Sequence, residues 1–273
     1  MPESPAPILR FENVTVVFDD MPVLSNLSFG AQQGESRVIL GAAGSGKTVL
    51  LKTALGLVKP ASGKVYVFGR DLTALSEREL FDIRSKIGML FQEGALFDSL
   101  TIEENVAYPL LNQKAIRVPR EQAHRRVAEA LEFVELGETL EKFPSELSGG
   151  MRRRVALARA VVANPALILC DSPTAGLDPI TSHTIMALLI KARDVTRTTT
   201  LLVTHRYQDG NLVANFRYNS KQGRLEPARN GARSDVRTTF MVLQQGRLVF
   251  EGDQDQLEAS KDRYISKFVK HRE

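Results

Sequence analysis

The fold is decided by the stretch Gly41-Ala42-Ala43-Gly44-Ser45-Gly46-Lys47-Thr48. This stretch fits the pattern G-x-x-x-x-G-K-[ST] of a phosphate-binding loop. Residues 37–40 in front of it predict a short buried strand, and residues 49–55 behind it predict a helix. Because a strand, a glycine-rich turn and a helix are the context in which this pattern binds phosphate, we expect a phosphate site here.

The residue types explain the chemistry of this loop. Gly41, Gly44 and Gly46 let the backbone take positive φ angles and approach a ligand closely. Successive N–H groups then converge on phosphate oxygens at a helix N-terminus, whose dipole favours negative charge. We expect Lys47 to reach the β- and γ-phosphates and the Thr48 hydroxyl to complete a Mg²⁺ shell. An ordinary glycine-rich turn is the alternative, but a match of this length in this context is specific.

Composition limits the remaining possibilities. The 273 residues, 43% of them hydrophobic, suffice for one large domain or two small ones with a substantial core. The single cysteine, Cys170, excludes an intramolecular disulfide, fits a reducing compartment and lies in an apolar run. No apolar run reaches the length of a membrane span, so we expect any membrane role to act through a partner. Residues 1–7 are expected to form a disordered tail.

The order of the predicted elements indicates an α/β fold. The strands are expected at 8–18, 23–29, 64–69, 87–91, 167–171 and 200–204, with a hairpin over 238–252 that turns at 245–246. The helices are expected at 76–85, from 101 onward, at 120–136, 148–162 and 180–193, with a polar helical tail over 255–273. A helical insert near 93–157 therefore interrupts the α/β core.

Six further features follow one another in a fixed order. They are Phe18, Gln92, Leu147-Ser148-Gly149-Gly150-Met151, the strand 166–171 ending in Asp171, Ala175-Gly176-Leu177-Asp178, and His205. With the phosphate loop, this series resembles the ATP-binding cassette (ABC) ATPases over residues 8–205. The resemblance implies a P-loop NTPase core with a helical subdomain and an antiparallel N-terminal β subdomain. We therefore expect an ABC ATPase domain over 8–253, with a helical tail over 254–273.

The resemblance also implies the site residues. ATP would be bound by Phe18, which stacks on adenine, by Gly41, Ala42, Ala43, Gly44, Ser45, Gly46, Lys47 and Thr48, and by Ser148, Gly149, Gly150 and Asp178 from the opposite subunit of a head-to-tail dimer. Mg²⁺ would be held by Thr48, Gln92 and Asp171, and the catalytic set would comprise Asp171, His205, Gln92 and the residue at position 172. Taken alone, each of these residues has a plainer interpretation: a helix cap for Asp171 and Ser148, a surface glutamine, a structural histidine and a core aromatic.

A narrower resemblance concerns the segments 91–101, 104–110, 144–151 and 176–181. They look like those of the Mce/Mla-type lipid-transport ATPases. That resemblance implies an integral-membrane permease docked through the insert near 92–110, an MCE-domain protein, and phospholipid or a related lipid as cargo. It places the chain in the cytoplasm, on the inner face of the cytoplasmic membrane. A non-transport ABC protein acting on nucleic acid is the rival, and we expect no nucleic-acid partner.

The sequence departs from the family at Ser172. Most members carry a glutamate after the Walker B aspartate, where it polarises the attacking water. A serine hydroxyl does not accept a proton near neutral pH, and loss of a general base costs about 10²–10⁴-fold in rate. Three interpretations stay open: slow hydrolysis that relies on Gln92 and His205, a heterodimer whose partner supplies the competent site, or Glu93 as a substitute carboxylate. A regulatory module that binds ATP without turnover is the related rival.

The second departure is the segment 206–237. It holds seven Lys/Arg against three Asp/Glu, which equals the net charge of +4 of the whole chain. It is longer than the corresponding connection in most family members, and we expect a structureless basic loop. A solvated loop and a contact with anionic lipid headgroups are the two interpretations.

Overall fold

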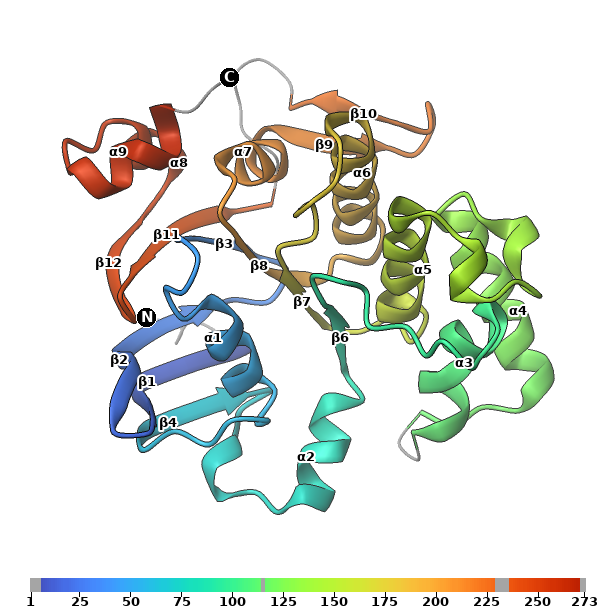
Figure 1. The fold of residues 1–273 in the computed structure, drawn as a ribbon, viewed down its shortest axis with the longest axis horizontal. Helices are drawn as coiled ribbons and strands as arrows, with labels where there is room; N and C mark the ends of the chain where they lie inside the picture. The colour runs from blue at the N-terminus through green and yellow to red at the C-terminus, as the bar shows by residue number, and fades with distance from the viewer. Residues whose placement is uncertain (1–5, 114–115, 229–235, 271–273) are drawn as a thin grey trace.

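The computed structural model describes residues 6–113, 116–228 and 236–270. Its centre is a six-stranded sheet in the order β12-β11-β3-β8-β7-β6 (Figure 1). The strands are β3 (Ser36–Leu40), β6 (Ile87–Leu90), β7 (Leu167–Asp171), β8 (Thr199–Thr204), β11 (Thr238–Gln244) and β12 (Arg247–Gly252). All neighbouring pairs are parallel except β11 and β12, which form the antiparallel hairpin expected from the sequence.

Alternate residues of these strands serve two different hydrophobic clusters. Along β7, Leu167 and Leu169 pack into the cluster shared with the N-terminal sheet, whereas Ile168 and Cys170 pack into the cluster under the helices. This period of two is the geometry of a strand whose faces are both covered. It explains why the strand reads as a continuous apolar run in the sequence.

A second, antiparallel sheet packs beside the first in the order β2-β1-β4-β5. Its strands are β1 (Leu9–Phe18), β2 (Met21–Ala31), β4 (Ser62–Val67) and β5 (Arg70–Asp71). The helix α1 (Lys47–Ala54) contacts strands of both sheets, and α2 (Glu77–Arg84) begins with a capping box between Ser76 and Glu79. The antiparallel N-terminal β subdomain is thus confirmed.

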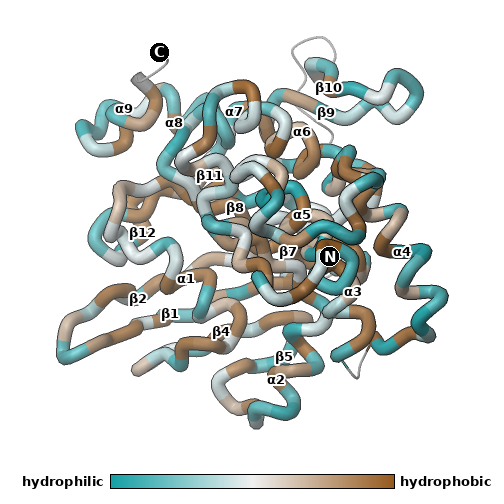
Figure 2. Tube along the Cα trace, turned by 45° about the vertical axis from the view of Figure 1, so that its right-hand side comes forward, coloured by the Kyte–Doolittle hydropathy of each residue, from teal (hydrophilic) through white to brown (hydrophobic). Residues whose placement is uncertain are grey.

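The helical insert lies to the side of the central sheet (Figure 1). It contains α3 (Ile102–Asn112), α4 (Arg120–Phe133) and α5 (Gly149–Val161), together with 3₁₀ turns at Gly137–Thr139 and Pro144–Glu146. The tube view in Figure 2 shows α4 with teal stretches on the outside of the molecule, as expected for an amphipathic helix. Within the described residues, no helix is both long and apolar enough to span a bilayer.

The segment after β8 differs from the expected loop. It forms α7 (Tyr207–Asn215) and then a hairpin of β9 (Phe216–Asn219) and β10 (Arg224–Pro227), while residues 229–235 lie outside the described part. The expectation of a structureless loop is therefore wrong for the described part of 206–237. The hairpin packs on α6 (Pro179–Thr196).

The tail forms two helices, α8 (Gln254–Glu258) and α9 (Arg263–Lys270). The tail is helical as expected, but it also has an apolar side, because Leu257, Ile265 and Val269 are buried. A single apolar stripe on a short helix is easily overlooked among charged neighbours. Of the expected N-terminal disordered tail, residues 1–5 lie outside the described residues.

Candidate nucleotide site

The phosphate loop connects β3 to α1 with its backbone accessible. Ala42, Ala43, Gly44 and Thr48 are exposed, so the loop can receive a ligand. Gly46 has φ 101°, and a Cβ there would lie 2.8 Å from Leu24 Cδ2 and 2.9 Å from the Val23 carbonyl oxygen. Only glycine meets both demands, so this part of the motif follows from backbone geometry as well as from ligand chemistry.

Lys47 is held by the loop itself. Its Nζ donates to the carbonyl oxygens of Gly41 at 2.8 Å and Ala42 at 2.7 Å, and the side chain is largely buried. Burial lowers the pKa of Lys47, whereas the negative charge of Asp171 raises it. The ammonium group of Lys47 therefore lies beside the exposed loop backbone, where a bound phosphate would accept a further hydrogen bond from it.

Two hydroxyl groups flank the carboxylate of Asp171. Thr48 Oγ1 donates to Asp171 Oδ2 at 2.7 Å, and Ser172 Oγ donates to Asp171 Oδ1 at 3.1 Å. A hydroxyl and a carboxylate are hard oxygen ligands of the kind that Mg²⁺ prefers, so this donor set fits the ion. The structure thus brings two of the three expected metal ligands together.

The third expected ligand, Gln92, lies two residues beyond β6 and is exposed. Since Leu90 of β6 pairs with Cys170 of β7, Gln92 leaves the sheet next to the end of the Asp171 strand. Its side chain makes no hydrogen bond to the described residues, so its role as a metal ligand stays a prediction.

The Ser172 hydroxyl is buried and already hydrogen-bonded, so it is not available to bind a water molecule. The residue is 6% exposed and its hydroxyl is engaged by Asp171. The turn behind it is held by Arg153, which donates to the Pro173 carbonyl oxygen at 2.7 Å. Burial lowers the pKa of Arg153 and the charge of Glu93 raises it. Glu93 therefore lies within electrostatic reach of this turn.

His205, a member of the expected catalytic set, is exposed directly after β8. The residues 204–209 around it are here named the switch segment. Behind His205, Asp209 accepts hydrogen bonds from Thr174 Oγ1 and Thr204 Oγ1, both at 2.7 Å. Burial raises the pKa of Asp209, while these two hydroxyls, Arg206 and His205 act in the opposite direction. Asp209 thus ties the turn after Asp171 to the switch segment, a link that the sequence analysis missed.

The segment 147–151, here named the signature segment, lies at the start of α5. Ser148 caps the helix by accepting from the Met151 N–H at 3.3 Å, and a Cβ on Gly150 would lie 2.6 Å from Thr181 Cγ2. Asp178 caps α6 in the same way, accepting from the Thr181 N–H at 3.0 Å. The Thr181 hydroxyl and N–H both lower the pKa of Asp178. The capping role expected for Ser148 is therefore confirmed, and Asp178 caps a helix as well.

The chain does not bring its own signature segment to its own phosphate loop. Figure 1 places α5 well apart from α1, with β6 and β7 between them. Ser148, Gly149 and Asp178 are exposed, and Ile180 next to them is 80% exposed. Phe18, at the far end of β1, is 45% exposed and available to stack on a ring.

A residue outside every motif also reaches the loop. Tyr264 of α9 accepts a hydrogen bond from the Ala42 N–H and donates one to the Leu243 carbonyl oxygen, each at 3.1 Å. No local pattern signals this contact, because the tail and the loop are 222 residues apart.

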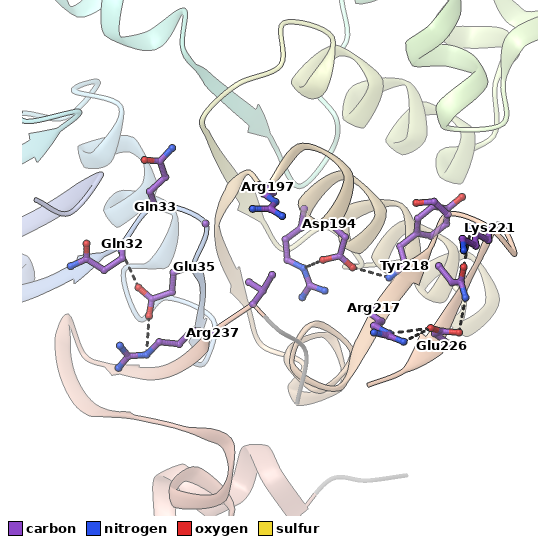
Figure 3. Close-up of a pocket in the computed structure, with 15 residues that line it drawn as sticks. Gln32, Gln33, Glu35, Asp194, Arg197, Arg217, Tyr218, Lys221, Glu226 and Arg237 are labelled. Atoms are coloured by element: carbon purple, nitrogen blue, oxygen red, sulfur yellow. Dashed lines mark hydrogen bonds and ion pairs between the residues drawn. The ribbon is translucent and has the colours of Figure 1, made fainter. Parts of the chain in front are cut away.

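A large cavity lies apart from the nucleotide site. It has a volume of about 1010 Å³ and lies between the β9–β10 hairpin, the end of α6 and the turn before β3 (Figure 3). Arg193 and Asp194 clamp the hairpin, and Arg217 pairs with Glu226 across it. Arg197 also faces this space and makes no ion pair with the described residues.

Comparisons with known proteins identify the family. A family model described as ABC transporter matches residues 24–175. The methionine import ATP-binding protein MetN of Carboxydothermus hydrogenoformans is 45% identical over 182 residues, which are 67% of this chain and 53% of that protein. The chain therefore spans about half the length of this relative.

Two other matches extend further. The intermembrane phospholipid transport system ATP-binding protein MlaF of Haemophilus influenzae is 32% identical over 263 residues, which are 96% of this chain and 90% of that protein. The solved dimeric post-hydrolysis state of the ATP-binding cassette MJ0796, bound to ADP and Pi, has a TM-score of 0.73 and 31% identity, and the match covers 90% of this chain and 98% of that one. The fold, the ordered motifs and these matches agree that the chain belongs to the ABC ATPase family.

Proposed function

We propose that this chain is the ATP-binding subunit of an ABC transporter for phospholipid or a related lipid. The observation that carries the proposal is the match to the phospholipid transport protein, which runs through 96% of the chain. The match to the methionine importer has higher identity but covers 67% of the chain. The segments 91–110 and 144–151, which resemble lipid-transport ATPases, support the same choice.

The cargo is tested on the chain purified with its permease in nanodiscs. ATP hydrolysis and bound lipids, the latter by mass spectrometry, would be measured with phospholipid and with methionine as the added cargo. Stimulation by phospholipid and co-purified lipid support the proposal. Stimulation by methionine alone would assign the chain to amino-acid import instead.

The site would act by positioning and electrostatics, as phosphoryl transfer requires. Lys47 and the loop N–H groups would hold the phosphates, and Thr48 and Asp171 would hold Mg²⁺, which neutralises developing charge when bound. A second copy or a related subunit would supply Ser148 and Asp178, as the dimeric state of the solved relative suggests.

The second candidate function is an ATP-dependent switch with little turnover. It is favoured by Ser172, whose hydroxyl is committed to Asp171 and which offers no base. ATP hydrolysis by the assembled transporter would be compared among wild type, Lys47→Ala and Ser172→Glu. Turnover of wild type above Lys47→Ala makes the chain a motor, whereas turnover restored only by Ser172→Glu makes it a switch.

Glu93 remains the proposed substitute carboxylate. Its charge acts on Arg153, which holds the turn after Asp171. Glu93→Gln is expected to reduce ATP turnover by about 10²-fold or more if Glu93 is the base. Unchanged turnover in Glu93→Gln would exclude this role.

The permease is proposed to dock in a groove between the helical insert and the core. The groove, of about 300 Å³, is lined by Phe97, Tyr108, Met89 and Arg159 among others. The rings of Phe97 and Tyr108 are in contact, tilted by 40° with their centroids 4.8 Å apart, and the two residues are 43% and 40% exposed. Gln113 Oε1 is buried at this groove without a hydrogen-bond partner among the described residues, so it offers an acceptor to a docked segment. An MCE-domain protein and the inner face of the cytoplasmic membrane belong to the same proposal, as does the absence of a nucleic-acid partner.

The basic segment 206–237, which contains the β9–β10 hairpin, is proposed to contact anionic lipid headgroups, at about 1 kcal/mol per basic residue near such a surface. Deleting 210–233 would remove most of α7 and all of β9 and β10, so charge reversal is the better test. Lys221→Glu with Arg224→Glu, at two exposed residues of the segment 206–237, is expected to reduce sedimentation with phosphatidylglycerol vesicles. Equal sedimentation of wild type and this variant would contradict the contact.

A further inference from the structure

The C-terminal helix reaches into the nucleotide site. The Tyr264 hydroxyl accepts from the Ala42 N–H and donates to the Leu243 carbonyl oxygen, so its proton and one of its lone pairs are both used. Leu243 belongs to β11, the strand beside β3. One side chain therefore joins the tail, the central sheet and the phosphate loop.

The contact acts on a peptide unit that also serves Lys47. The carbonyl of Gly41 and the N–H of Ala42 belong to the same planar peptide group. The carbonyl accepts from Lys47 Nζ at 2.8 Å and the N–H donates to Tyr264 at 3.1 Å. Rotation of this plane would break both bonds, so Tyr264 fixes the acceptor that orients the lysine.

The tyrosine is itself held firmly. Its ring meets Phe268 edge-on at 5.3 Å, and Ile265 and Val269 of the same helix are buried. Asp262 accepts from the N–H groups of Tyr264 and Ile265 at the start of α9. The hydroxyl is thus presented from a packed helix rather than from a loose end.

The tail also borders the switch segment. A cavity of about 500 Å³ is lined by Ala42, His205, Arg206, Tyr264, Lys267 and Phe268. The phosphate loop, the residues after β8 and α9 therefore share one space, whose lining includes the cationic side chains of Arg206 and Lys267. A helix placed there is able to respond to the charge that enters with a nucleotide.

We propose that Tyr264 is a positioning residue of the phosphate loop, which orients the Gly41–Ala42 peptide for Lys47 and makes α9 part of the ATP site. The plainer alternative is that the hydroxyl only completes the hydrogen bonding of the β11 end. The two differ in whether the hydroxyl affects ATP binding, and whether it does so through Lys47.

The test is the substitution Tyr264→Phe in the full chain, which removes both hydrogen bonds and keeps the ring. Tyr66→Phe is the matched control, since Tyr66 lies in β4, on the N-terminal sheet. The dissociation constant of a fluorescent ATP analogue and the melting temperature would be measured for each. We expect Tyr264→Phe to weaken ATP binding about two- to tenfold, the effect of one neutral hydrogen bond, with no change in Tyr66→Phe.

A double-mutant cycle with Lys47→Ala separates positioning from mere stability. In the Lys47→Ala background, Tyr264→Phe is expected to have no further effect on ATP binding, because the lysine that it orients is gone. Equal ATP affinity of wild type and Tyr264→Phe would overturn the proposal. The same fold-loss with and without Lys47 would overturn it as well.

Discussion

At the scale of single residues, the Asp171 carboxylate shows how the site is balanced. Each of its oxygens accepts from a hydroxyl, one from Thr48 and one from Ser172. The glutamate usual at position 172 would place a second negative charge here, and serine replaces it with a donor. The serine therefore donates a hydrogen bond to the Asp171 carboxylate but removes the general base that the glutamate would supply. ATP turnover is for this reason the property to measure.

Cys170 provides a sensitive probe of folding. It is the only cysteine of the chain, it is fully buried, and burial together with the Asp171 charge raises the pKa of its thiol. We expect reaction with a disulfide reagent only through unfolding, at least about 10³-fold slower than for a free thiol. ATP at about 100 times its dissociation constant is expected to slow labelling about a further 100-fold.

Lys47→Ala is the control for this labelling experiment, since ATP should no longer protect its Cys170. Rapid labelling of native wild type would contradict the burial of the thiol. Protection by ATP that persists in Lys47→Ala would show that the nucleotide stabilises the chain at some other place.

Asp209 predicts a pH dependence of stability. Because burial raises the pKa of Asp209 above the ordinary 3.8, the folded chain retains its proton more readily than the unfolded chain. Stability from this group is fully present below the unfolded pKa and is lost as pH rises through the folded pKa. The free energy of unfolding of wild type relative to Asp209→Asn should therefore fall from about pH 4 upward. Urea unfolding at a series of pH values measures the difference, and a difference that rises with pH would contradict it.

At the scale of elements, the β9–β10 hairpin depends on one arginine. Arg193 is 2% exposed and donates to Asp194 and to the carbonyl oxygens of Val213 and Phe216. Arg193→Ala is expected to lower the free energy of unfolding by about 3 kcal/mol or more and to expose the hairpin to proteases. Arg197→Ala, at an exposed neighbour, is the control and should stay within about 0.5 kcal/mol. Equal effects of the two variants would refute the clamp.

The elements that could be predicted are those specified by neighbouring residues in the sequence, and those that depend on distant contacts were missed. The helix starts near residues 76 and 101, the phosphate loop and the buried strand of Asp171 depend on local sequence, and the structure confirms them. The hairpin was missed because its strands have only four residues each and β9 is held by Arg193 from α6, which is distant in the sequence. Tyr264 was missed for the same reason, since its partners lie in distant segments. The roles of Gln92, His205 and Phe18 stay predictions, because they concern a bound nucleotide.

At the scale of the whole molecule, the docking groove predicts separable functions. Phe97→Ser with Tyr108→Ser is expected to abolish co-purification with the permease and leave ATP binding within about twofold of wild type, because the pair lies apart from the phosphate loop. Phe143→Ser is the matched control, since Phe143 is 42% exposed in the same insert but outside the groove. Permease binding that survives in the double variant would place the docking surface elsewhere.

The position of β3 in the central sheet has a consequence for synthesis on the ribosome. This strand carries the phosphate loop, yet it pairs with β8 and with β11, the latter completed only near residue 244. The roughly two hundred residues in between take about 10–40 s to translate, during which the β11 edge of β3 lacks its final neighbour. A nascent chain therefore carries the complete loop motif long before it has the strand that completes the sheet beside the loop. ATP affinity gained only after residue 244 has left the exit tunnel would be the sign of this late assembly.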